Sequence, residues 1–316
     1  MPALRVVYMG TPRFAVPTLD AIVAAGHEVL AVLTQPDRPK GRGQALQAPP
    51  VKECALQLGL RVEQPERVRR PEAVEMLRGL HADIMVVVGY GQIIPQPILD
   101  LPPLGIVNVH ASLLPKYRGA GPIQWAIANG ETVTGVTTMR IDAGLDTGDM
   151  LLRRETPIGP EEDAMQLGER LSLMGAELLV ETLTGLQQGS ITPIPQDNTQ
   201  ATYAPLLKKE DGRIDWSQTA TVLHNRARGF LPWPGCYTRF RGQGFHIWRC
   251  RPAIGNTPLA PGQIRGENGR LLAGCGEGTA LELLEVQVEG RKRLEGASFL
   301  NGQRLLEYEF LGEHTN

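Results

Sequence analysis

Residues 82–91 read ADIMVVVGYG, an almost unbroken apolar run that has the length of a strand and ends in glycine. A strand with one face in water alternates apolar and polar side chains, whereas a strand covered on both faces stays apolar throughout. The run is also far shorter than the roughly 20 residues that a membrane helix needs. It therefore predicts a central strand of a parallel sheet with helices packed on both faces.

The rest of the first half repeats this strand with helical segments in between. Further strands are expected at 4–10, 28–34, 61–65, 105–110, 135–141 and 149–158. Helices are expected at 18–26, 49–59, 71–80, 122–130 and 162–189. Strands that alternate with helices predict a doubly wound, mostly parallel, Rossmann-like α/β sheet with right-handed crossovers. The last two strands alternate in polarity, which favours an antiparallel edge.

The composition and the hydrophobic periodicity of the sequence change after Gly189. Residues 190–208 are rich in Pro, Asn, Asp and Gln and show little periodicity, which is typical of a linker. Residues 209–316 contain about five short strands separated by turn residues, a pattern that predicts a small OB-like β-barrel. The expected domains are 1–189, with the linker 190–208, and 209–316.

Charge and cysteine content narrow the class of protein. Residues 1–205 hold 17 Lys+Arg against 22 Asp+Glu, a net −5, and residues 206–316 hold 15 against 12, a net +3. The four cysteines have no C-x-x-C spacing, so neither a zinc site nor a disulfide framework is expected. The amino terminus lacks the apolar region of a secretory signal. We expect a reduced, cytoplasmic enzyme that has no metal and does not bind a membrane.

The stretch GIVNVHASLLPKYRGAGP, residues 105–122, places polar side chains at the end of a predicted strand. Asn108 and His110 are two positions apart, so their side chains point to the same side. Ligands of open α/β sheets bind at the carboxyl ends of the strands, where these two residues lie. Two donors there suit a developing oxyanion, and the imidazole also exchanges protons near neutral pH. The alternative is that both residues merely finish the strand.

The loop that follows favours a binding site. Ser112, Leu113, Leu114 and Pro115 begin a turn with further Gly and Pro residues, which restrict its path. A rigid, half-apolar turn beside polar donors suits a flat heteroaromatic ligand.

A second polar segment, RIDAGLDTGDM at residues 140–150, lies between two predicted strands. Asp142 and Asp149 are typical of turns. Asp146 lies at the middle of the loop, from where it can reach His110 and stabilise an imidazolium. Because no Ser or Cys is placed as a nucleophile, we expect direct group transfer without a covalent enzyme intermediate.

These motifs resemble the folate-dependent formyltransferases. The resemblance rests on N-x-H-x-S-L-L-P, a following R-G, and D-x-G-L-D-T-G-D some 25 residues further on, and it covers essentially the whole chain. It implies 10-formyltetrahydrofolate as the donor co-substrate. It also implies that Asn108, His110 and Asp146 are catalytic, and that the segment from Ser112 to Pro115 lines the folate site.

The opening MGTPRFAVPTLDAI, the segment TQPDRPKGRG at 34–43, and RIDWSQTA and FLPWPG further on are similar to the members that formylate the α-amino group of methionine on initiator methionyl-tRNA. That resemblance implies a C-terminal tRNA-binding barrel and a basic loop at 34–50 that inserts at the tRNA acceptor arm. Arg38, Lys40 and Arg42 would bind its phosphates. The alternative is a mobile, solvated loop. A monomer is expected.

Three other functions remain open at this point. A formyltransferase acting on glycinamide ribonucleotide or an amino-sugar nucleotide would share the Asn, His and Asp but not the basic loop with the barrel. A nucleic-acid-binding module without catalysis would leave Asn108, His110 and Asp146 unexplained. A hydrolase that releases formate from the folate would not need the basic loop.

For Arg226 and Arg228 the sequence leaves two alternatives open. Both side chains line a path for the tRNA, or both lie on a helix that is simply exposed to solvent.

Overall fold

The computed structural model describes residues 2–40, 45–255, 259–306 and 308–312, which form two compact units. The first unit contains the described residues up to Pro122 together with 133–157 and 168–204. The second contains 123–132, 158–167 and the described residues from Pro205 onward. Each unit is therefore assembled from segments that are separated in the sequence.

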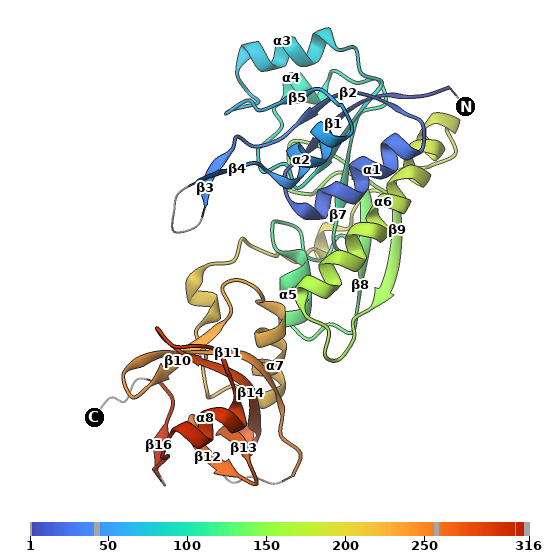
Figure 1. Ribbon diagram of the computed structural model, residues 1–316. Helices are drawn as coiled ribbons and strands as arrows, with labels where there is room; N and C mark the ends of the chain where they lie inside the picture. Colours follow the sequence, from blue (N-terminus) through green and yellow to red (C-terminus); the bar gives the residue numbers. More distant parts are fainter. Residues whose placement is uncertain (1, 41–44, 256–258, 307, 313–316) are drawn as a thin grey trace. The chain divides into compact units, whose positions relative to one another are not determined.

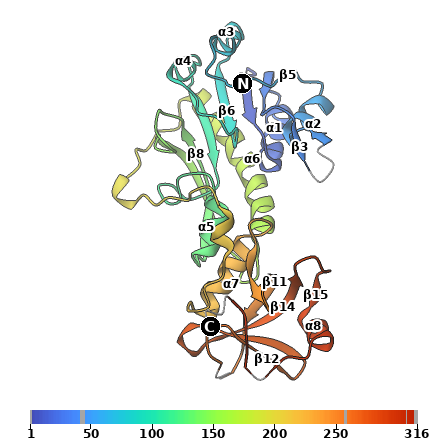
Figure 2. The same ribbon diagram turned by 90° about the vertical axis from the view of Figure 1, so that its left-hand side faces the viewer.

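The first unit is built on a seven-stranded sheet in the order β5-β2-β1-β6-β7-β8-β9. Figures 1 and 2 show strands of this sheet with helices beside them. The strands are β1 (Arg5–Gly10), β2 (Glu28–Leu33), β5 (Val62–Glu63), β6 (Ile84–Val88), β7 (Ile106–His110), β8 (Val133–Arg140) and β9 (Met150–Pro157). The pairs from β5 to β7 are parallel, and β8 and β9 are antiparallel. The predicted mostly parallel sheet with an antiparallel edge is confirmed.

Helices cover both faces of this sheet. They are α1 (Val16–Ala24), α2 (Pro50–Gln57), α3 (Pro71–Gly79), α4 (Gln96–Leu99) and most of α6 (Ala164–Gln188), whereas α5 (Pro122–Ala128) belongs almost wholly to the second unit. Met85 and Val87 of β6 join a core with Leu77 of α3. On the opposite face, α6 approaches so closely that a Cβ at Gly175 would lie 2.8 Å from Val109. All five residues of β6 are buried, which explains the apolar run that predicted it.

The basic segment 34–50 is more regular than predicted. It contains a two-stranded antiparallel hairpin of β3 (Arg38–Lys40) and β4 (Ala45–Gln47), in which Arg38 faces Gln47. The sequence analysis did not predict these two strands within the basic loop. The two strands are only three residues long, which is too short for period-two alternation to reveal them in the sequence.

The second unit contains a nearly closed antiparallel barrel in the order β10-β11-β14-β13-β12-β16, with β15 beside β14. Its strands are β10 (Cys236–Phe240), β11 (Gln243–Pro252), β12 (Gln263–Glu267), β13 (Arg270–Gly274), β14 (Ala280–Val288), β15 (Leu294–Glu295) and β16 (Glu309–Phe310), and its helices are α7 (Ala220–Gly229) and α8 (Gly296–Gly302). An antiparallel bridge between Phe240 and Leu311 brings the two edge strands together. The five predicted strands are β10 to β14, and the two-residue strands were missed.

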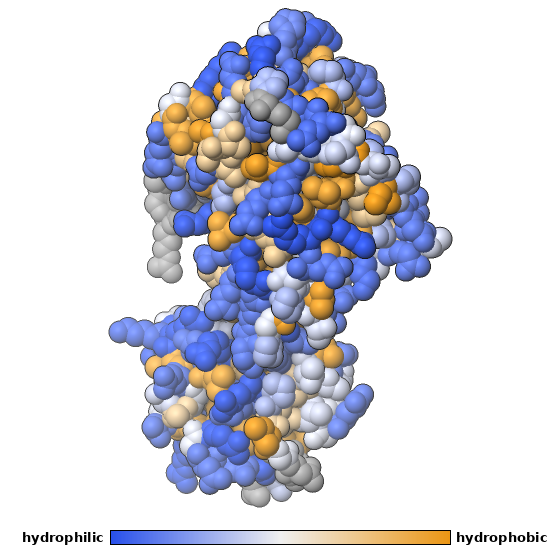
Figure 3. All heavy atoms as spheres, turned by 90° about the vertical axis from the view of Figure 1, so that its right-hand side faces the viewer, coloured by the Kyte–Doolittle hydropathy of each residue, from blue (hydrophilic) through white to orange (hydrophobic). Residues whose placement is uncertain are grey.

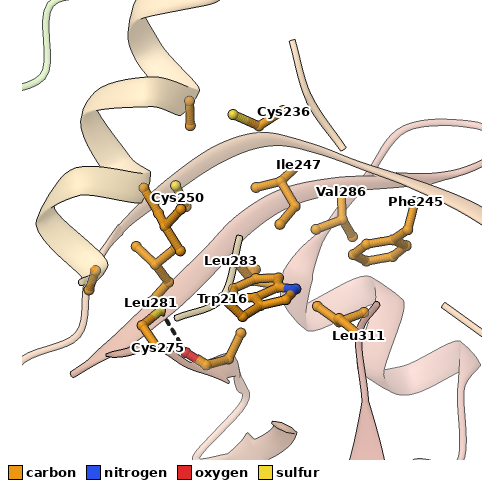
Figure 4. Packing of buried hydrophobic residues seen from close by; sticks show 14 of the residues in the cluster. Trp216, Cys236, Phe245, Ile247, Cys250, Cys275, Leu281, Leu283, Val286 and Leu311 are labelled. Carbon is orange, nitrogen blue, oxygen red and sulfur yellow. Dashed lines mark hydrogen bonds between the residues drawn. The ribbon is translucent and has the colours of Figure 1, made fainter. Parts of the chain in front are cut away.

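The barrel is filled by apolar side chains from its inward-facing positions. Trp216, Phe245 and Val286 pack together in the close view of the core (Figure 4). Cys236, Cys250 and Cys275 belong to the same cluster, and all four cysteines of the chain are buried free thiols. Burial raises the pKa of the Cys236 and Cys275 thiols to about 12, so they remain protonated near neutral pH.

The face drawn in Figure 3 is largely hydrophilic, with hydrophobic side chains gathered in small patches. Among the described residues, no helix has both the length and the apolar composition that are needed to cross a membrane.

Candidate active site

Asn108 and His110 lie on β7, whose parallel neighbour β6 ends at the same edge of the sheet. Asn108 is half-buried, and His110 is only 5% exposed. His110 is the last residue of the strand and Asn108 is the third from last, so their side chains lie on the same side of the sheet. The fold thus delivers an amide and an imidazole to the edge where open α/β sheets bind ligands.

The two imidazole nitrogens of His110 face different groups. Nε2 lies 2.9 Å from the backbone oxygen of Tyr117, and Nδ1 lies 3.7 Å from Oδ2 of Asp146. A carbonyl oxygen only accepts, so Nε2 must carry a proton and donate it to Tyr117. In the neutral ring, Nδ1 is then the basic nitrogen. A proton taken up at Nδ1 lies between the ring and a carboxylate, which stabilises the cation.

Asp146 is held from several sides. Its Oδ2 accepts a hydrogen bond of 2.8 Å from the backbone N–H of Gly119, and its Oδ1 lies 3.5 Å from Nδ2 of Asn108. Its backbone is in the left-handed region, with φ of 51°, a conformation that Asp tolerates better than most residues. The loop between β8 and β9 therefore directs this carboxylate toward Asn108 and His110.

Glycine is required at two positions that shape the site. Gly119 has φ of 113°, and a Cβ there would lie 2.7 Å from the backbone oxygen of Ala204. At Gly148 a Cβ would overlap the backbone oxygen of Arg140. Any larger residue at either place must move the backbone that holds Asp146.

Comparison with known proteins identifies the family. A formyl transferase family model matches residues 4–183, and a formyl transferase C-terminal domain model matches residues 206–304. A methionyl-tRNA formyltransferase of Solibacter usitatus is 68% identical over 98% of this chain and 99% of its own. One of Koribacter versatilis is 59% identical over 94% of this chain and 95% of its own.

The chain belongs to the methionyl-tRNA formyltransferase family.

Solved structures of other formyltransferases share the fold of this enzyme at low sequence identity. A sugar 3N-formyl transferase superimposes with a TM-score of 0.66 at 18% identity, over 92% of this chain and 100% of its own. A glycinamide ribonucleotide transformylase from Symbiobacterium toebii has a TM-score of 0.51 at 20% identity, over 62% of this chain and 95% of its own. These likenesses show a common fold and carry no argument about the acceptor.

The four residues predicted to line the folate site differ in their exposure in the enzyme. Ser112 and Leu114 have no exposed surface, and the Ser112 hydroxyl donates to the backbone oxygen of Lys116. Leu113 and Pro115 are half-buried, and Leu113 packs close to Gly135 of β8. The role of this segment in folate binding remains a prediction.

Apolar surface at the same edge of the sheet comes from a loop that the sequence patterns did not single out. The segment after β6 turns through Gly89 and Gly91, which have φ of 57° and 83°, and leaves Ile93 88% exposed. β6 pairs with β7 so that Val87 faces Asn108, which places this loop beside the polar cluster. The available signal was a Gly-x-Gly turn followed by two isoleucines at the end of a buried strand.

The basic residues of segment 34–50 are only partly described. Arg38 is exposed, the side chain of Lys40 is not among those described, and Arg42 lies outside the described residues. The base of the hairpin is anchored by Asp37, which accepts hydrogen bonds from Gln64 and Lys52. These two bonds, that of Gln64 most strongly, lower the pKa of Asp37.

Two arginines whose role the sequence left open are engaged within the second unit. Arg226 donates to the backbone oxygen of Asp211 and stacks 5.0 Å from the ring centre of Phe230. Arg228 donates to the backbone oxygens of Gly159 and Glu162. Neither guanidinium is simply solvated on a helix, since each holds neighbouring segments of its unit together.

Proposed function

We propose that this enzyme transfers the formyl group of 10-formyltetrahydrofolate to the α-amino group of methionine on initiator methionyl-tRNA. The observation that carries the proposal is the cluster of Asn108, His110 and Asp146 in a chain that is 68% identical, over nearly its full length, to a protein named for this reaction. Because the charged tRNA is used in translation, we propose that the reaction takes place in the cytoplasm.

The reaction needs an oxyanion to be stabilised and one proton to be moved from the attacking nitrogen to N10 of the folate. The amine nitrogen attacks the formyl carbon, and the carbonyl oxygen becomes the oxyanion of a tetrahedral intermediate. The attacking nitrogen then loses a proton, the bond from carbon to N10 of the folate breaks, and N10 gains a proton. Tetrahydrofolate and N-formylmethionyl-tRNA leave with atoms and charge balanced.

We assign the oxyanion to hydrogen bonds from the Asn108 amide. The amide has two N–H donors, and only a long 3.5 Å contact to Asp146 engages Nδ2 among the described residues. A preorganised donor at such a position is worth about 2.7–4 kcal/mol of transition-state stabilisation.

We assign the proton of the attacking amine to the pair formed by Nδ1 of His110 and the Asp146 carboxylate. This assignment is supported by the hydrogen bond that Nε2 gives to Tyr117, because it leaves Nδ1 as the basic nitrogen of the neutral ring. The same pair can return the proton to N10, so no other acid is needed.

The acceptor tRNA is proposed to contact both units. On the first unit we propose phosphate contacts by Arg38, Lys40 and Arg42 of the basic segment 34–50. On the second unit the excess of positive charge in residues 206–316 favours contact of the barrel with the tRNA backbone. We propose a monomer, since the catalytic cluster is assembled from one unit of a single chain.

The test is formyl transfer from 10-formyltetrahydrofolate to charged initiator methionyl-tRNA, run beside glycinamide ribonucleotide and a 4-amino-sugar nucleotide. Transfer to the tRNA alone is expected. Transfer to a small amine only would refute the proposed acceptor, while leaving the catalytic cluster and the folate donor in place.

A further inference from the structure

The segment 194–204, which the sequence predicts as part of a linker, is bound along two loops of the first unit. Ile194 and Met150 exchange backbone hydrogen bonds of 2.9 and 2.8 Å. Further along, the backbone of Arg118 donates to Thr202 and accepts from Ala204, at 2.8 and 2.7 Å. One end of the segment thus lies beside the loop of Asp146, and the other lies beside the turn that follows His110.

Between these ends, a buried arginine meets a glutamine. Arg118 is 2% exposed, and its Nε and Nη2 lie 3.0 and 2.8 Å from Oε1 of Gln196. Nη2 also donates to Oδ1 of Asn198 at 2.9 Å. A guanidinium only donates, so the amide oxygen of Gln196 must face Arg118, and its NH2 group must point the other way.

That NH2 group holds the loop of Asp146. Nε2 of Gln196 donates to the backbone oxygens of Asp146 and Gly148, both at 2.8 Å. The Gln196 amide therefore accepts hydrogen bonds through its oxygen and donates through its nitrogen. The hydrogen bonds from Arg118 fix which of the two atoms faces the loop of Asp146. The residue that follows Arg118 is Gly119, whose N–H is the donor to the Asp146 carboxylate.

We propose that Gln196 and Arg118 are positioning residues that fix Asp146 in its left-handed conformation and hold its carboxylate against His110. The proposal rests on the proposed function, because it gives these residues a role through Asp146. Neither residue contacts Asn108 or His110 by a hydrogen bond among those described, so neither is assigned a chemical step.

The deciding variant is Gln196→Glu. A glutamate keeps an acceptor for Arg118 and pairs its buried charge, but it cannot donate to the backbone oxygens of Asp146 and Gly148. The ion pair with Arg118 offsets only part of the loss of these two hydrogen bonds, so the variant is expected to fold with a lowered midpoint of thermal unfolding. We expect kcat for formyl transfer to fall by about 10–100-fold, as a displaced catalytic group does, with KM for the tRNA and for the folate within about twofold.

The matched control is Gln187→Glu. Nε2 of Gln187 also donates to a backbone oxygen, that of Pro2 at 2.8 Å, but it lies on α6 away from the catalytic cluster. This variant is expected to leave kcat within about twofold. Arg118→Lys is expected to lower kcat in the same direction as Gln196→Glu, because a lysine cannot hold the amide through two donors.

A stable Gln196→Glu enzyme with wild-type kcat would overturn the proposal. Should that variant not fold, Gln196→Met removes the same donors without adding charge and decides the question in the same assay. Combination with Asp146→Asn adds a second criterion, since a residue that acts through Asp146 has little further effect once the carboxylate is gone. Full additivity of the two losses would also contradict the proposal.

The same set of enzymes separates this inference from the proposed function. If the wild-type enzyme forms no formylmethionyl-tRNA, the proposed function fails. If the wild type is active but Asp146→Asn is equally active, the role of Asp146 fails. If Asp146→Asn is impaired and Gln196→Glu is not, only the positioning role fails.

Discussion

The most informative single substitution is Asp146→Asn, which removes a charge while preserving shape. An amide oxygen can still accept the hydrogen bond from Gly119, so the free energy of unfolding is expected to change by no more than about 1 kcal/mol. What disappears is the attraction between the carboxylate and an imidazolium at His110. This variant therefore tests the electrostatic part of the mechanism with little effect on the fold.

The size of the effect follows from the distance between the two groups. At 3.7 Å and an effective dielectric constant of about 20, two unit charges interact by about 4.5 kcal/mol. That is about three powers of ten in rate. The Asp146 side chain is 17% exposed, and screening by water reduces the expected loss in kcat to about 10²–10³-fold.

The assay is single-turnover formyl transfer at saturating folate and tRNA, with thermal unfolding measured on the same preparation. Asp142→Asn is the control in the same loop. Asp142 accepts hydrogen bonds from Gly144 and Thr147 and is exposed, and asparagine can keep these turn contacts. A folded Asp146→Asn enzyme that retains more than about a tenth of wild-type kcat would refute the electrostatic reasoning.

Three further substitutions test other parts of the account. His110→Ala should lower kcat by about 10²–10⁴-fold and the free energy of unfolding by about 1–3 kcal/mol, since a buried hydrogen bond is lost; normal single-turnover rates would remove His110 from the mechanism. Gly119→Ala should lower the free energy of unfolding by about 1–3 kcal/mol and should also reduce kcat. Gly26→Ala is the control and should leave kcat unchanged, because Gly26 has φ of 79° but no atom lies near an added Cβ. Equal effects of the two substitutions on kcat would contradict this prediction. Arg38→Ala should raise KM for the tRNA and lessen its salt dependence while sparing KM for the folate; unchanged tRNA kinetics would argue against the hairpin contact.

The parallel sheet could be predicted because its signals are local. A strand buried on both faces, such as β6, is apolar throughout, and Pro50 and Pro71 mark helix starts where a missing N–H costs nothing. The alternation of side chains along β7 likewise suffices to predict that Asn108 and His110 share one side of the sheet.

What escaped prediction depends on contacts between distant segments. Gln196 lies in a stretch without periodicity, and its amide becomes informative only when Arg118 and the loop of Asp146 are seen beside it. The short hairpin pairs only three residues on each strand, which is too few to show an alternation of apolar and polar residues in the sequence. The hydrogen bond from the Ser112 hydroxyl to the backbone oxygen of Lys116 is local, but no spacing rule indicates it.

We propose that the enzyme moves a formyl group from a folate to the α-nitrogen of methionine on its tRNA. The most direct test uses 10-formyltetrahydrofolate labelled with carbon-13 in the formyl group, followed by mass spectrometry of the amino acid released from the tRNA. Labelled N-formylmethionine is expected in an amount equal to that of the tetrahydrofolate formed. Label recovered as free formate, with unmodified methionine on the tRNA, would contradict it and identify a hydrolase instead.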